Sequence, residues 1–328
     1  MIGLKGNYSI MKTGNLLLGT ITFGQQTDIE QAREMVNTAL DAGVREIDSA
    51  YVYNEGTCEM ILGEILKDIP RDRFRIATKV NPRITGKLDR EAVTMQQKES
   101  LRRLNLDYSD VMYLHFPDPT TPIEETLDAC NDLYKQGLFR ELGLSNYHID
   151  DIVKISEICK AEYEMKPVVF EGVYNAFSRN VENDLLPGIR RLGMRFTAYN
   201  PLAGGMLTGK YMSFEEKPDD GRFAVRASYQ KRYWKEEFFE GADIIRKACD
   251  EEGIAMAEAS LRWLEFHSGL SADHEDGIII GASRPSQLAA NLKSIEQGPL
   301  PESMLDAFDR AWEACRSVAP SYFRTVGK

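Results

Sequence analysis

The chain has 328 residues, of which 43% are hydrophobic and 28% are charged, a composition typical of globular proteins. Its formal net charge of -11 argues against nucleic acid and anionic membranes as partners. The five cysteines lack the spacing of a zinc site or disulfide framework, and neither a signal peptide nor a membrane-spanning run is visible, so we expect a cytoplasmic protein with reduced thiols and no metal.

Short β-rich segments alternate with helical segments along the chain. Strands are predicted at 15–18, 46–48, 75–79, 110–115, 141–145, 168–174, 195–200 and 277–280. Helices are predicted at 28–42, 56–66, 90–104, 123–135, 150–161, 184–192 and 285–295. Asp28 and Asp150 stand where helix N-caps are expected, and Gly43 and Gly137 just past helix ends.

The alternation changes after the seventh predicted strand. Residues 212–241 form a long, charged and aromatic-rich insertion, which is typical of a functional lid. Residues 242–266 then predict two more helices, and residues 301–315 a final one. Eight strands with intervening helices favour a (β/α)8 TIM barrel, an α/β fold, with a long loop after strand 7 and a C-terminal helix. Residues 1–328 are expected to form one domain, because no linker or repeat divides them.

Four polar residues lie at or just beyond the ends of successive predicted strands. Asp48, Tyr53, Lys79 and His115 supply a carboxylate, a phenol, an amine and an imidazole. Because barrel strands end on one face, where barrel enzymes hold their chemistry, we expect these side chains to converge there.

These four groups suit the reduction of a carbonyl. The phenol of Tyr53 would donate a proton to the oxygen as hydride arrives at the carbon. The ammonium of Lys79 would lower the pKa of that phenol, Asp48 would hold Lys79 in place, and His115 would orient the carbonyl.

Each residue also has a simpler interpretation. Asp48 could cap a helix, Tyr53 could be a loop aromatic, Lys79 a surface charge and His115 a core histidine. Lys79 at a strand end could alternatively be the Schiff-base lysine of an aldolase-type lyase. The four together favour the reductase interpretation.

The chain resembles the aldo-keto reductases over nearly its whole length. The resemblance rests on Leu18-Gly19-Thr20, the run from Glu46 to Gly56, Ala77-Thr78-Lys79, Leu114-His115 and the run from Leu142 to Tyr147. Within that superfamily, the runs from Tyr199 to Tyr211, Arg232 to Glu236 and Tyr322 to Arg324 look most like the aflatoxin-aldehyde reductase branch. The resemblance implies NADPH-dependent reduction of aldehydes and dicarbonyls. Potassium-channel β-subunits, which share the fold and regulate while holding NADPH, are the alternative.

Part of the cofactor site is expected around strands 5 to 7. The sequence has no Gly-x-Gly-x-x-Gly after a strand, which excludes a Rossmann site, and the Gly204–Lys210 run is followed by Tyr211 instead of the Ser or Thr of an NTPase loop. The resemblance implies that the nicotinamide and pyrophosphate are held by residues of these strands and the following insertion, namely Ser145, Asn146, Glu171, Tyr199, Asn200, Leu202, Gly204, Lys210 and Arg222.

Glu171 departs from the family pattern, which usually has glutamine there. A carboxylate can only accept hydrogen bonds from the carboxamide of the nicotinamide, whereas glutamine can also donate.

The remaining cofactor residues follow the eighth strand. Gly281 and Ser283 precede a helix N-terminus, where exposed amides and the helix dipole favour an anion. Ser283 and Arg284 are placed to bind a ribose 2′-phosphate, with Gln287 and Asn291 on the adenine side. The preference for NADP over NAD is carried by the resemblance.

Arginines and aromatic residues predict the substrate side. Arg232, Trp234 and Arg324 are expected to border the barrel opening and bind small aldehydes, especially those with a carboxylate. Surface salt bridges with Glu236 or Asp309 are the alternative for the two arginines. A small-molecule carbonyl is the expected partner, and a homodimer is left open.

Overall fold

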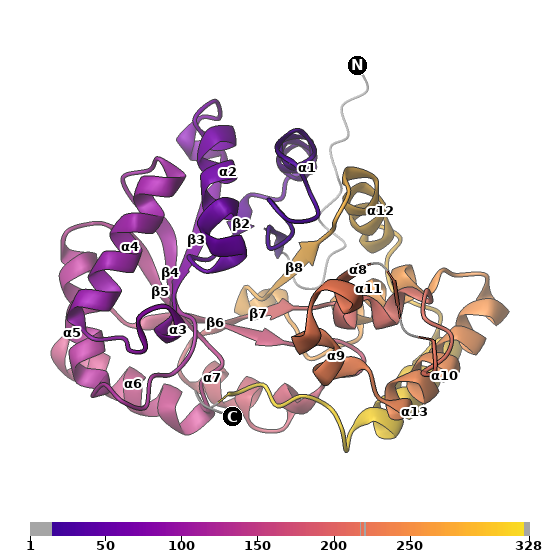
Figure 1. Ribbon diagram of the computed structural model, residues 1–328. Coiled ribbons are helices and arrows are strands. Elements are labelled where there is room, and N and C mark those ends of the chain that lie inside the picture. Colours follow the sequence, from indigo (N-terminus) through magenta and orange to yellow (C-terminus); the bar gives the residue numbers. More distant parts are fainter. Residues whose placement is uncertain (1–14, 217, 220, 325–328) are drawn as a thin grey trace.

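The computed structural model describes residues 15–216, 218–219 and 221–324, and its centre is a closed barrel of eight parallel strands in sequence order (Figure 1). The strands are β1 (Asn15–Gly19), β2 (Glu46–Asp48), β3 (Arg75–Val80), β4 (Ser109–Leu114), β5 (Phe139–Ser145), β6 (Pro167–Val173), β7 (Arg195–Tyr199) and β8 (Gly277–Gly281). Every predicted strand is present, so the TIM-barrel prediction is confirmed.

Helices surround the barrel. They are α1 (Ile29–Asp41), α2 (Thr57–Leu66), α3 (Pro82–Thr85), α4 (Arg90–Leu104), α5 (Ile123–Lys135), α6 (Ile149–Glu162), α7 (Leu185–Arg191), α8 (Gly221–Val225), α9 (Ala227–Tyr233), α10 (Glu236–Glu252), α11 (Met256–Phe266), α12 (Pro285–Ile295) and α13 (Glu302–Cys315). Short 3₁₀ segments lie at Tyr53–Gly56, Arg71–Arg73, Asn180–Glu182, Ala203–Thr208 and Ala272–His274. In the part of the chain that the structure describes, no helix is both long and apolar enough to cross a membrane.

The predicted helix ends are confirmed with one exception. The Asp28 side chain accepts a hydrogen bond from the Gln31 amide at 2.9 Å and caps α1. Asp150 is not the N-cap of α6, because the helix begins one residue earlier and His148 occupies the cap, its Nδ1 accepting from the Asp150 amide at 3.3 Å. The error arose because histidine is a weaker N-cap signal than aspartate.

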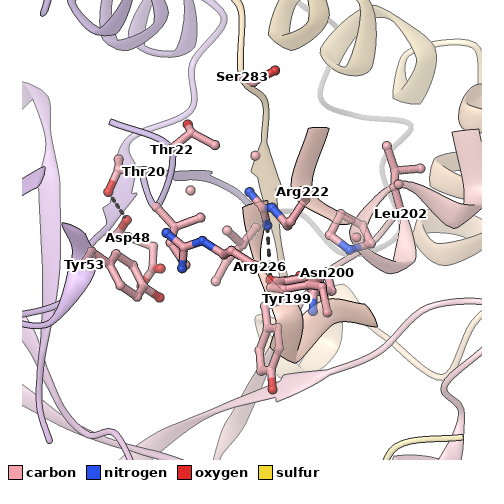
Figure 2. A pocket seen from close by; sticks show the side chains of 18 of the residues that line it. Thr20, Thr22, Asp48, Tyr53, Tyr199, Asn200, Leu202, Arg222, Arg226 and Ser283 are labelled. Atoms are coloured by element: carbon pink, nitrogen blue, oxygen red, sulfur yellow. Dashed lines mark hydrogen bonds between the residues drawn. The ribbon is translucent and has the colours of Figure 1, made fainter. Parts of the chain in front are cut away.

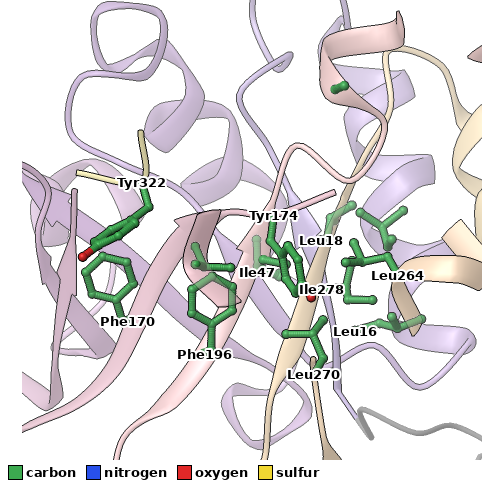
Figure 3. Close-up of a cluster of buried hydrophobic side chains, with 14 of the residues drawn as sticks. Leu16, Leu18, Ile47, Phe170, Tyr174, Phe196, Leu264, Leu270, Ile278 and Tyr322 are labelled. Atoms are coloured by element: carbon green, nitrogen blue, oxygen red, sulfur yellow. The ribbon is translucent and has the colours of Figure 1, made fainter. Parts of the chain in front are cut away.

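Alternate residues along each strand pack in two places, beneath the surrounding helices and inside the barrel. Outward-facing residues such as Ile47, Phe170, Phe196 and Ile278 are buried beneath the helices in the main hydrophobic core (Figure 3). Inside the barrel, Ala77, Val111, Tyr113 and Val169 form a separate small cluster. The period of two along each strand therefore places every second residue inside the barrel.

The barrel interior is charged on both sides of this apolar layer. Near the strand starts, Arg75 pairs with Glu46 at 3.1 Å and Glu141 at 3.0 Å, and Arg195 also pairs with Glu141. Two residues further along β2, Asp48 is the next inward position after Glu46. A salt-bridge network thus fills the lower end, and the opposite end is left for the candidate site.

The insertion and the C-terminal segment border the upper end of the barrel. Residues 212–241 contain α8, α9 and the start of α10, so the predicted loop after strand 7 is largely helical. Beyond α13 the chain returns toward β5 (Figure 1), where the Arg324 amide donates to the Asn146 carbonyl at 2.9 Å. This contact places the C-terminal segment beside the ends of the strands.

Candidate active site

A cavity of about 760 Å³ opens at the C-terminal ends of the strands (Figure 2). Its lining includes Asp48, Tyr53 and His115, three of the four predicted catalytic residues. The fourth, Lys79, is fully buried directly behind them. The structure therefore brings the predicted constellation together.

Lys79 is enclosed by three oxygen-bearing groups. Its Nζ donates to the Asp48 carboxylate and to the Ser49 carbonyl oxygen at 2.9 Å. The same Nζ lies 3.1 Å from Glu171 Oε2. Burial alone would lower the pKa of Lys79, but the two carboxylates hold it above its ordinary value, so the amine stays an ammonium.

This environment excludes the aldolase interpretation of Lys79. A Schiff-base lysine must present a neutral amine to its substrate. The amine of Lys79 is ion-paired, wholly buried and behind the lining of the cavity.

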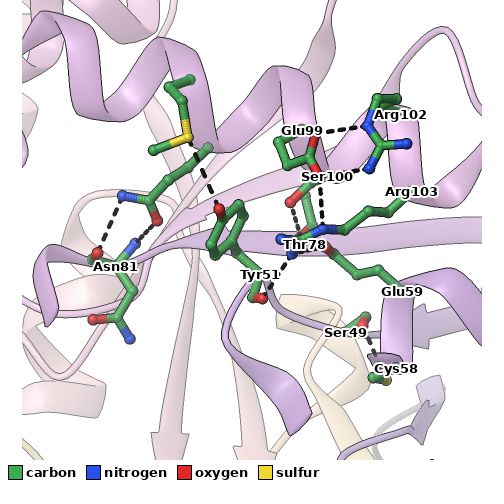
Figure 4. Close-up of polar contacts among 12 residues, drawn as sticks. Ser49, Tyr51, Cys58, Glu59, Thr78, Asn81, Glu99, Ser100, Arg102 and Arg103 are labelled. Atoms are coloured by element: carbon green, nitrogen blue, oxygen red, sulfur yellow. Dashed lines mark hydrogen bonds and ion pairs between the residues drawn. The ribbon is translucent and has the colours of Figure 1, made fainter. Parts of the chain in front are cut away.

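The loop after β2 carries Tyr53 into the cavity. Arg103 of α4 donates to the Tyr51 carbonyl oxygen at 3.1 Å and pairs with buried Glu59 of α2 at 3.3 Å (Figure 4). Asn54 has a positive φ of 50°, and its amide group donates to the backbone of Phe23 at 2.7 Å. Helix and loop contacts on both sides of Tyr53 therefore fix its position.

Tyr53 faces His115 and Lys79 within the site. Its ring is edge-on to that of His115, with centroids 6.2 Å apart, and Lys79 Nζ lies 5.4 Å from its centroid. Burial and the charges of Asp48 and Glu171 raise the pKa of Tyr53 well above its ordinary value. The expected lowering by Lys79 is absent, because burial is the largest cause and raises the pKa of Tyr53.

His115 is held as one neutral tautomer. The Asn81 Oδ1 accepts from the Arg83 amide at 2.9 Å, so Asn81 Nδ2 is the atom 3.2 Å from His115 Nδ1. His115 Nδ1 must then accept, which puts the ring proton on Nε2. Burial, with the nearby charges of Lys79 and Arg83, lowers the pKa of His115 well below its ordinary value. The imidazole can therefore donate from Nε2.

The predicted cofactor residues mostly line this same cavity. Ser145, Asn146, Glu171, Tyr199, Asn200, Leu202, Gly204, Lys210, Arg222, Gly281, Ser283, Gln287 and Asn291 all border it, as do Arg232 and Arg324. Two predicted residues do not border it: Arg284 is exposed at the start of α12, and Trp234 packs among Tyr211, Phe223 and Phe239.

The groups in the cavity fit a nicotinamide dinucleotide. Asn200 Nδ2 is buried and makes no hydrogen bond within the described residues, so it can bind a polar ligand. Gly204 and Gly205 have positive φ values of 71° and 116°, and a Cβ on Gly204 would come within 2.6 Å of the Tyr229 ring. Glycine therefore keeps the backbone accessible here, beside the cationic Lys210.

Two basic lining residues, Arg83 and Arg226, were not predicted from the sequence. Arg83 lies 4.1 Å over the Phe116 ring, and Arg226 donates to Gln25 at 2.7 Å and to Asn54 at 2.9 Å. Arg226 lies in the same insertion as Arg222, and Arg83 follows the end of β3. A search for cations in every strand-to-helix loop would have found both.

The alternative of surface salt bridges for the two substrate arginines is not supported. Arg232 makes no ion pair within the described residues and lies instead over the rings of Tyr229 at 5.4 Å and Tyr233 at 5.9 Å. Asp309 pairs with Arg179 at 2.7 Å.

Comparison with known proteins agrees with this geometry. The sequence profile described as the aldo/keto reductase family matches residues 15–313. The chain is 41% identical to human "Aldo-keto reductase family 7 member A3" over 94% of this chain and 96% of that protein. It is also 41% identical to human "Aflatoxin B1 aldehyde reductase member 2", covering 94% and 89% respectively, and 32% identical to "Oxidoreductase sirO" of Leptosphaeria maculans, covering 94% and 96%.

Proposed function

The chain belongs to the aldo/keto reductase family, most like its aflatoxin-aldehyde reductase branch, and we propose that it reduces aldehydes to alcohols with NADPH. Family membership supports an oxidoreductase that acts on carbonyls with a nicotinamide cofactor. The choice of NADPH, the role of Tyr53 and the substrate class are our proposals. The observation that carries them is the meeting of Tyr53, His115 and the Asp48–Lys79 pair in one basic cavity.

The proposed chemistry assigns one task to each residue. NADPH, when bound, would supply a hydride to the carbonyl carbon. Tyr53 donates its phenolic proton to the oxygen, where negative charge develops. His115 donates from Nε2 to the same oxygen and orients it, consistent with its neutral tautomer. Lys79, held by Asp48, provides the positive charge that stabilises the phenolate left on Tyr53.

Binding of NADPH is proposed to use the other side of the cavity. Asn200, Tyr199 and Glu171 would face the nicotinamide, and Lys210 with Arg222 the pyrophosphate. Ser283 at the start of α12 would meet the 2′-phosphate, with Gln287 and Asn291 toward the adenine. Ser283 Oγ already donates to Gln287 at 3.0 Å, which aligns these two side chains.

The substrates proposed are small aldehydes and dicarbonyls, including aldehydes that carry a carboxylate. Arg232 and Arg324 border the cavity and make no ion pair within the described residues. Their guanidinium groups therefore can bind a carboxylate without first breaking a salt bridge.

Oxidation of NADPH with a panel of aldehydes tests this function. Arg232→Ala and Arg324→Ala should each raise KM for an acidic aldehyde about 10- to 100-fold, because a charge-assisted hydrogen bond is worth ~1.5–3 kcal/mol. A neutral aldehyde of similar size should be affected much less. No turnover with any aldehyde would contradict the function, and equal losses on both substrates would contradict only the carboxylate preference.

A further inference from the structure

The proposed proton transfer to the carbonyl oxygen does not use one buried carboxyl group, that of Glu171. Lys79 needs one counter-ion, and Asp48 provides it. Glu171 of β6 nevertheless lies on the same ammonium, at 3.1 Å, and is 3% exposed. The site therefore holds two acidic side chains against one basic side chain.

Glu171 and Asp48 share the ammonium of Lys79. Lys79 Nζ donates to the Asp48 carboxylate and also lies 3.1 Å from Glu171 Oε2. One ammonium can neutralise only one carboxylate, and two buried carboxyl groups on the same cation disfavour each other's ionisation. Asp48 accepts the hydrogen bond from Lys79 and is thereby stabilised as the anion, which leaves the proton on Glu171.

We propose that Glu171 is a positioning residue that carries a proton at neutral pH and, by losing it in alkaline solution, makes Tyr53 a weaker proton donor. The inference rests on the proposed function, since it assigns Tyr53 as the donor. It gives the reduction an upper pH limit that is set by Glu171 and not by Tyr53 itself.

The titratable groups around Glu171 support this assignment. They are Asp48 on β2, Lys79 on β3, Tyr113 on β4, Tyr199 on β7 and Tyr53 on the loop after β2, while the neighbouring β5 residue is Ser145. With Glu171 protonated, the Asp48–Lys79 pair is neutral overall. Once Glu171 ionises, the cluster of Asp48, Lys79 and Glu171 carries a net charge of −1 beside Tyr53. A phenolate on Tyr53 then becomes harder to form.

The surroundings of Glu171 move its ionisation into alkaline solution. Burial, and next the charge of Asp48, raise the pKa of Glu171 to about 8. The ammonium of Lys79 opposes this rise. The change therefore falls within the range in which the protein can be assayed.

The first test is the pH profile of kcat for aldehyde reduction at saturating NADPH. The unmodified enzyme should lose about tenfold in kcat between pH 7 and pH 9, since a close charge changes a pKa by ~1–3 units. Glu171→Gln keeps the shape of the side chain without the ionisation, so its pH profile of kcat should be flat over this range. An equal alkaline loss in both proteins would overturn the inference.

The second test needs no turnover. In empty protein labelled with ¹³C at the glutamate carboxyl carbons, NMR should show one resonance titrating near pH 8 that disappears in Glu171→Gln. Glu141→Gln is the matched control, because it removes a carboxylate from the neighbouring strand at the other end of the barrel. That variant should retain the resonance. Absence of any such resonance overturns the inference even if the protein reduces aldehydes, whereas its presence in a protein without activity would contradict only the proposed function.

Discussion

Replacing Glu171 by glutamine should change how the stability of the protein depends on pH. The pKa of Glu171 is raised to about 8 in the folded protein, because of burial and the charge of Asp48. In the unfolded chain a glutamate has a pKa of about 4.3. Between these two values the folded protein keeps a proton that the unfolded chain has released.

The sign of the effect follows from this difference. A group whose pKa is raised on folding contributes stability that is present below about pH 4.3 and is lost as the pH rises to about 8. Each pKa unit corresponds to ~1.36 kcal/mol, so the full loss is about 3–5 kcal/mol. Glu171→Gln has no such proton, and its free energy of unfolding should not fall by this amount.

Urea denaturation at pH 5 and pH 8.5 measures the prediction. The difference in unfolding free energy between Glu171→Gln and the unmodified protein should grow by about 3–5 kcal/mol in favour of the variant at the higher pH. Glu141→Gln corrects for the removal of a negative charge elsewhere in the barrel. Its unfolding free energy should change between the two pH values by the same amount as that of the unmodified protein. A difference that is the same at both pH values would refute the reasoning.

Three further substitutions test other parts of the account. Asp276→Ala removes a fully buried carboxylate that pairs with Arg190 and accepts from backbone amides, so urea denaturation should show a loss of ~3–5 kcal/mol in stability, and a loss below 1 kcal/mol would contradict this role. Gly63→Ala would place a Cβ 2.2 Å from the Arg103 carbonyl oxygen between α2 and α4, and should cost about 1–3 kcal/mol by the same assay unless the helices separate freely. Arg284→Ala should weaken NADPH binding more than NADH binding in a fluorescence titration, and equal losses would remove Arg284 as the reader of the 2′-phosphate.

The barrel and the catalytic group were predictable because local patterns specify them. Asp48 ends β2, Lys79 lies near the end of β3 and His115 directly follows β4, and parallel strands can only end on one face of a barrel. Asp48, Lys79 and His115 therefore converge once the eight strands are recognised.

Other features depend on contacts between distant residues and could not be read from the sequence. The direction of the pKa change at Tyr53 depends first on its burial and then on the charges of Asp48 and Glu171. Glu171 is more than one hundred residues away from Tyr53 and meets Lys79 only across the barrel. The exposed position of Arg284 depends on how α12 begins after β8. The salt bridges around Arg75 likewise join strands that are distant in sequence.

The central claim is that Tyr53 gives the proton in NADPH-dependent aldehyde reduction. Tyr53→Phe, assayed by NADPH oxidation with the best aldehyde of the panel, measures it most directly, together with NADPH binding followed by tryptophan fluorescence. We expect kcat to fall by a factor of ~10²–10⁴ while the affinity for NADPH is unchanged, because the phenol supplies a proton and not binding energy. A variant that keeps most of its kcat would contradict the account.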